Sequence, residues 1–196
     1  MKKLGLDVSE EVRQHEKMGQ ALLKIDYENR WGNFTFYAAG MKTLGFDVAE
    51  EVKEHEKQIW LELEKYAIRH DWQNFTQYAR AMNALDLDVT EEVRIHETEI
   101  RKRLIRYTQD MAKKDRFGVA NFVRHAVNMN SVGLDVTEEA RQHEPEIRKQ
   151  LQEYADSNDW LAFTHHARDM LELGLLTPNP QAETTRMPPL KEFKEK

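Results

Sequence analysis

The chain has 196 residues, with 35 acidic and 29 basic side chains and no cysteine. Without cysteine there is no disulfide framework, thiolate metal site or cysteine nucleophile, so we expect a protein of a reducing compartment, the cytoplasm. Acidic and basic side chains are interspersed, and no window approaches the roughly 20 apolar residues of a membrane span, so neither nucleic acid nor a membrane is an expected partner.

Two motifs recur along the chain in alternation. The first reads LGLDVSEEVRQHE in its first copy, and its spacings are 40, 41 and 47 residues; the copies begin at Leu4, Leu44, Leu85 and Val132. The second reads WQNFTQYARAM in its second copy; the copies begin at Trp31, Trp72, Val119 and Trp160. We therefore predict a single domain over residues 1–176 with four repeats, at residues 4–43, 44–84, 85–131 and 132–176.

The first motif opens a long helix in each repeat. In the second repeat Val52, Ile59 and Tyr66 fall on one apolar stripe at helical spacing. Asp47 with Glu50 has the spacing of a capping box, and the Ser or Thr found two residues after the Asp in other repeats is an alternative cap.

The second motif predicts a shorter amphipathic helix, in which Trp72, Phe75 and Met82 keep the helical period. A glycine follows the last apolar residue in three repeats, where it supplies a left-handed C-cap; these are Gly45, Gly133 and Gly174. The third copy of the first motif carries Asp86 at the glycine position instead.

Because neither helix of a hairpin can bury its stripe alone, neighbouring hairpins must stack. The expected fold is all-α: a right-handed α-α solenoid of four tandem helical hairpins of about 41 residues, resembling the HEAT, armadillo and tetratricopeptide class in architecture.

Three places depart from the repeat pattern. Pro145 lies inside the fourth long helix and predicts a kink or break there; if it opens a new helix, every unit instead has three helices. The third repeat has six more residues between Tyr107 and Phe122 than the second has between the equivalent residues, and insertions in solenoids often lie on the binding face. Its candidate contact residues are Lys113, Lys114, Arg116 and Phe117.

Residues 177–196 hold four of the five prolines and are expected to form a disordered tail, with a docking peptide as the alternative.

Each repeat also contains a His-Glu pair, and both residue types bind metals. The pairs are His15-Glu16, His55-Glu56, His96-Glu97 and His143-Glu144. In these dipeptides the chain resembles deoxyhypusine hydroxylase, a helical-repeat enzyme whose di-iron site is built from His-Glu pairs. That resemblance implies a metal-binding or metalloenzyme function.

We favour a structural role for these histidines and expect no cofactor. Each lies on the apolar stripe four residues after a glutamate, as His55 follows Glu51, and equivalent positions in stacked helices lie about 8–10 Å or more apart, too far for four pairs to share one ion. Protonation of this set near about pH 6 is expected to change stability.

One polar aromatic per repeat forms a second column on the short helices. Its members are Tyr37, Tyr78, His125 and His166, which are candidates for the floor of a binding groove. The chain has only three serines and no glycine-rich phosphate loop, so catalysis is not expected. The leading hypothesis is a non-catalytic scaffold for a protein or peptide partner, and end-to-end stacking of copies is a further possibility.

Overall fold

The computed structural model describes residues 31–113, 115 and 117–176, and this part of the chain is all-helical. Its helices are α2 (Trp31–Leu44), α3 (Ala49–Ile68), α4 (Trp72–Ala84), α5 (Thr90–Ala112), α6 (Gly118–Ser131), α7 (Thr137–Gln142), α8 (Glu144–Asp156) and α9 (Trp160–Glu172). None of these helices is long and apolar enough to cross a membrane. Several predictions concern residues outside this part of the chain. They are the first long helix, the pair His15-Glu16, the residues Lys114 and Arg116, and the segment 177–196.

The long helices begin one residue later than the capping-box interpretation requires, so that interpretation is wrong. Val48 is the N-cap of α3 and makes no side-chain cap, and Val89 and Val136 do the same for α5 and α7. The preceding aspartate instead closes a local turn by accepting the N–H two residues on, as Asp47 does from Ala49 at 3.1 Å. Asp88 and Asp135 repeat this bond, because a short carboxylate reaches its own backbone easily. The Ser/Thr alternative is wrong as well, since Thr90 is already helical.

The predicted left-handed turns after the short helices are confirmed. Gly45, Gly133 and Gly174 have φ values of 97°, 88° and 68°, and Asp86 adopts the same conformation at 64°. The turns between long and short helices also contain left-handed residues, His70 and Asn158, which the sequence pattern did not reveal.

The predicted break at Pro145 is confirmed. α7 ends at Gln142, and α8 begins at Glu144 with the proline in its first turn, where the missing N–H costs nothing. The three-helix alternative fails for the second and third long helices, because α3 and α5 run unbroken for 20 and 23 residues.

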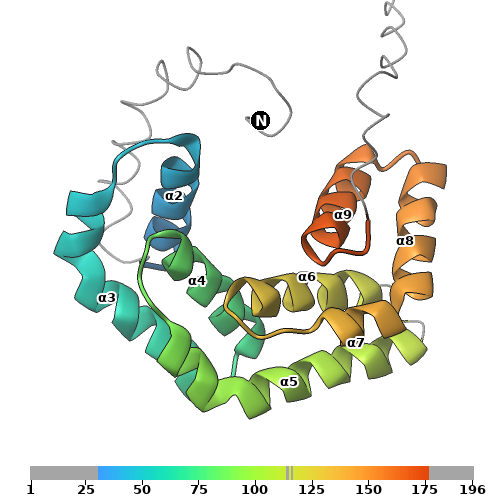
Figure 1. Cartoon of the computed structure of the whole chain (residues 1–196), viewed down its shortest axis with the longest axis horizontal. Helices are drawn as coiled ribbons and strands as arrows, with labels where there is room; N and C mark the ends of the chain where they lie inside the picture. The colour runs from blue at the N-terminus through green and yellow to red at the C-terminus, as the bar shows by residue number, and fades with distance from the viewer. Residues whose placement is uncertain (1–30, 114, 116, 177–196) are drawn as a thin grey trace, which may run out of the picture.

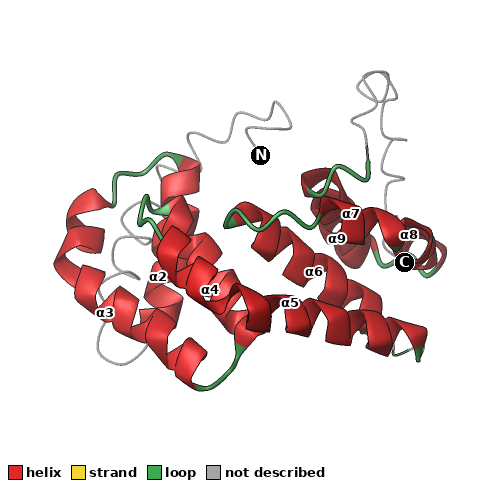
Figure 2. Ribbon diagram, turned by 60° about the horizontal axis from the view of Figure 1, so that its bottom comes forward, coloured by secondary structure: helices red, strands yellow, loops and turns green. Residues whose placement is uncertain are grey.

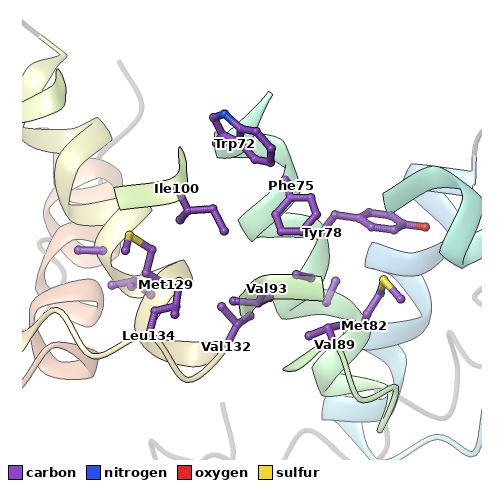
Figure 3. Close-up of a cluster of buried hydrophobic side chains, with 14 of the residues drawn as sticks. Trp72, Phe75, Tyr78, Met82, Val89, Val93, Ile100, Met129, Val132 and Leu134 are labelled. Atoms are coloured by element: carbon purple, nitrogen blue, oxygen red, sulfur yellow. The ribbon is translucent and has the colours of Figure 1, made fainter. Parts of the chain in front are cut away.

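The helices follow an arc with two layers. Figure 1 shows α3, α5 and α8 along its outer side, and Figures 1 and 2 both show α2, α4, α6 and α9 following one another along its inner side. Apolar side chains of both layers form one buried core, and Figure 3 shows Phe75 of α4, Val93 of α5 and Met129 of α6 meeting within it. On the inner side Arg80 of α4 reaches past α6 to Glu172 of α9 at 2.7 Å.

The insertion in the third repeat divides between a longer helix and a short loop. α5 is three residues longer than α3, and Asp115 then turns the chain by accepting the N–H of Phe117 at 2.8 Å. Gly118 begins α6 so close to α5 that a Cβ would lie 2.8 Å from the Met111 nitrogen. A side chain at this position is therefore excluded by the backbone of α5.

Candidate functional site

The histidines of the His-Glu pairs pack against aromatic rings of the preceding short helix. The centroid of the His55 ring lies 5.1 Å from that of Trp31 and 5.6 Å from that of Phe34. His96 repeats both contacts on α4, at 5.1 Å from Trp72 and 5.5 Å from Phe75. His143 lies 5.2 Å from Phe122 of α6. In three places, therefore, a histidine joins one segment to the next.

The glutamates of the same pairs turn toward the residue four positions later on their own helix. Glu97 accepts from Arg101 at 2.7 Å, Glu144 accepts from Arg148 at 2.6 Å, and Glu56 accepts a long bond of 3.4 Å from the Trp60 indole. Within the described ranges, no group of three or more His, Cys, Asp or Glu side chains is close enough to hold a metal ion.

The four polar aromatic residues of the short helices differ in how deeply they are buried. Tyr37 is 49% exposed, whereas Tyr78, His125 and His166 are buried within the core. The Tyr78 hydroxyl lies 2.7 Å from Thr35 Oγ1 of α2, and burial raises the pKa of this phenol above its ordinary value. The three buried rings are out of reach of a ligand, so they do not form the floor of a binding groove.

His125 is held at both ring nitrogens. Nε2 lies 3.2 Å from the carbonyl oxygen of Ile100 and therefore carries the hydrogen, while Nδ1 lies 3.3 Å from Thr76 Oγ1. Burial lowers the pKa of His125 from 6.5 to about 4, against the smaller opposing effect of the Ile100 carbonyl. His166 makes the equivalent bond to the Ile147 carbonyl, and burial lowers its pKa too.

Two of the candidate contact residues in the insertion lie among the described residues. Lys113 is exposed, and the Phe117 ring is 60% exposed at the N-cap of α6. They flank the loop but do not line a cavity that the structure records.

The side of α9 that carries Trp160 and Leu161 is an apolar surface that sequence analysis missed. Trp160 is 58% exposed and Leu161 is 73% exposed, whereas Trp72, which has the same motif position in α4, is 8% exposed. The difference arises because α5 covers α4 and places His96 on Trp72, while no described helix follows α9 in the same way. The sequence held a signal, because the segment after α9 lacks the DVxEE motif.

A second missed feature is an open hollow of about 380 Å³ between α3 and α5. Its apolar lining comes from Trp60, Leu61, Leu63, Ala67 and Phe75, with His96 beside them, and its charged lining comes from Lys57, Glu64 and Glu92. The sequence signal is Trp60, which occupies the position of Arg101 and Arg148 in later segments.

No protein-family model matches the chain, and neither a curated protein nor a solved structure matches it. Among the described residues, the candidate binding surfaces are the uncovered side of α9 and the hollow between α3 and α5.

Proposed function

We propose that the chain is a non-catalytic scaffold that binds a helix of a partner protein on the uncovered side of α9, which carries Trp160 and Leu161. We further propose that it is a right-handed α-α solenoid of four tandem hairpins; the histidine contact that recurs from one segment to the next supports this architecture. The cysteine-free sequence supports a cytoplasmic location.

One observation carries the proposal: a motif that is buried on α4 is exposed on α9. Trp160 and Leu161 present an apolar surface, and Thr164 beside them is exposed, whereas its counterpart Thr76 is buried against His125. Exposed apolar surface of this kind on a folded protein indicates an interaction site.

The contacts made on α2 and α4 define the chemistry of the partner helix. In both places the covering helix presents a buried valine and, three residues later, a histidine that packs on Trp and Phe; on α3 these are Val52 and His55. The expected partner therefore has an amphipathic helix with a small apolar residue and a planar ring three positions apart.

The experiment uses a synthetic peptide of residues 44–63, which carries Val52 and His55, as the probe helix. The full-length chain, labelled uniformly with ¹⁵N so that backbone amides report binding in variants that lack an indole, is titrated with this peptide by NMR. We expect the Trp160 indole to shift, and we expect the Trp160→Ala variant to bind about tenfold more weakly, because aromatic anchors supply much of the energy of such contacts.

The matched control is Trp60→Phe, which changes a tryptophan on the far side of the arc and is expected to leave peptide affinity unchanged. Equal binding by the wild type and Trp160→Ala would overturn the proposal. Sedimentation of the chain alone then tells whether a second copy is itself the partner: a mass that rises with concentration and is lost in Trp160→Ala identifies self-association through α9.

A further inference from the structure

In the later segments of the chain, an arginine of the long helix bonds to the segment that follows the next short helix. Arg101 of α5 donates to Glu139 of α7 at 3.1 Å and to the carbonyl oxygen of Asp135 at 3.2 Å. Arg148 of α8 occupies the same motif position and donates to the carbonyl oxygen of Leu175 at 2.7 Å. In both places the guanidinium of a long helix donates a hydrogen bond to a backbone carbonyl that follows the next short helix.

Between α3 and α5 this arginine is replaced by Trp60. The acceptors are nevertheless present in the sequence, because Glu92 stands where Glu139 does and Asp88 stands where Asp135 does. Trp60 donates only to Glu56 of its own helix, and the hollow of about 380 Å³ opens beside it. The structure thus has a carboxylate, Glu92, lining the hollow at the motif position where Glu139 accepts from the Arg101 guanidinium.

The charges around the hollow favour a cation. Glu64 and Glu92 both line it, against one basic residue, Lys57. Glu64 takes the place of Ile105 of the next segment, so this contact has one more carboxylate than its successor. The indole of Trp60 adds aromatic surface, on which a planar guanidinium stacks better than a lysine ammonium.

We propose that the hollow between α3 and α5 binds an arginine side chain of a partner polypeptide. The guanidinium pairs with Glu92 and Glu64 and its aliphatic part lies along Trp60 and Leu61, so that the partner supplies in trans the contact that Arg101 makes within the chain. The site deepens the proposed scaffold function but uses a surface separate from α9, so each proposal can fail without the other.

The test is an NMR titration of the full-length chain with three short acetylated peptides that differ only at a central residue, which is arginine, lysine or citrulline. The arginine peptide is expected to shift the Trp60 indole and leave the Trp160 indole unchanged. The lysine peptide is expected to bind about fivefold more weakly, and the uncharged citrulline peptide about tenfold more weakly, because each loses part of the paired hydrogen bonds or the charge.

Three variants test whether the arginine peptide binds at this site or is only attracted to the protein by its charge. Trp60→Arg rebuilds the contact of Arg101 within the chain and is expected to abolish peptide binding while keeping the fold, since the arginine at this position is accommodated in α5. Glu92→Gln is expected to weaken the arginine peptide about tenfold. Trp60→Phe keeps an aromatic surface and is expected to retain binding within about threefold.

Two results would overturn the proposal: equal affinity for the arginine and lysine peptides, or unchanged arginine binding in a folded Trp60→Arg variant. The variant Trp160→Ala keeps the two proposals distinguishable, because it is expected to bind the helix peptide of residues 44–63 about tenfold more weakly and to bind the arginine peptide as the wild type does. That helix peptide contains no arginine, so it does not compete for the hollow through a guanidinium.

Discussion

At the scale of single residues, identical motif positions have different environments because of what covers them. Trp72 and Trp160 begin the same motif, yet one is 8% and the other 58% exposed. Sequence analysis could predict that each lies on the apolar side of a helix, because that depends on periodicity alone. It could not predict the exposure, which depends on whether a second helix packs there.

The histidines of the short helices control how stability depends on pH. His125 is neutral in the folded protein, and its pKa of about 4 lies below the ordinary value of 6.5. As the pH falls below about 6.5, the unfolded chain takes up a proton that the folded chain does not, so the free energy of unfolding falls until about pH 4. We expect a loss of about 3 kcal/mol from this residue at most, and His166 changes stability in the same direction.

Urea unfolding between pH 7 and pH 4.5 checks this prediction. The His125→Gln variant is expected to have a flatter profile than the wild type, whereas His165→Gln, at an exposed position, is expected to leave the profile unchanged. A wild-type profile that is flat, or one that rises toward acid, would contradict the assignment. The sequence predicted a pH effect for the His-Glu pairs, and it could not reveal that burial would shift the histidines of the other column.

We expect substitution by alanine to change the free energy of unfolding in opposite directions at two glycines, Gly133 and Gly40. Gly133 has a φ of 88°, so Gly133→Ala is expected to lower the free energy of unfolding by about 1–2 kcal/mol. Gly40 lies inside α2 with nothing within 4 Å of an added Cβ, so Gly40→Ala is expected to raise it by about 0.5–1 kcal/mol. Denaturant unfolding of both variants measures the difference; the same sign for both would refute the left-handed turn.

At the scale of helices, the sequence predicts where a helix breaks better than how it starts. Pro145 has one local consequence, the loss of an N–H inside a helix, and α7 and α8 divide there. Asp47 has two local options, an N-cap or a turn before the helix, and both satisfy the same spacing to Glu50. Only the backbone geometry shows that the turn is formed and that Val48 is the N-cap.

The crossing of α5 and α6 depends on a glycine that the sequence pattern did not single out. A Cβ on Gly118 would lie 2.8 Å from the Met111 nitrogen and 3.0 Å from the Asp110 carbonyl carbon, and these backbone atoms cannot move without bending α5. Gly118→Ala is therefore expected to lower the free energy of unfolding by about 1–3 kcal/mol. Thermal unfolding checks this against Gly40→Ala, and a Gly118→Ala variant as stable as the wild type would show that the two helices can separate.

At the scale of the whole molecule, the histidine contact is the feature that links sequence motif to architecture. The long-helix motif places a histidine where it meets the aromatic rings of the preceding short helix, at His55, His96 and His143. The all-helical fold follows from the periodicity. The two candidate surfaces do not, because one arises from an uncovered copy of the motif and the other from Trp60 in place of an arginine.

The central proposal is that α9 binds a partner helix through the contact that α2 makes with α3, in which a histidine packs on the Trp and Phe rings of the short helix. The most direct test is a double-mutant cycle that combines Trp160→Ala in the full-length chain with His55→Ala in the peptide of residues 44–63. We predict a coupling free energy of about 1 kcal/mol between the two side chains, as expected for a pair of stacked rings. If the peptide binds but the two substitutions are additive, the histidine does not lie on Trp160 and the proposed mode of binding is contradicted.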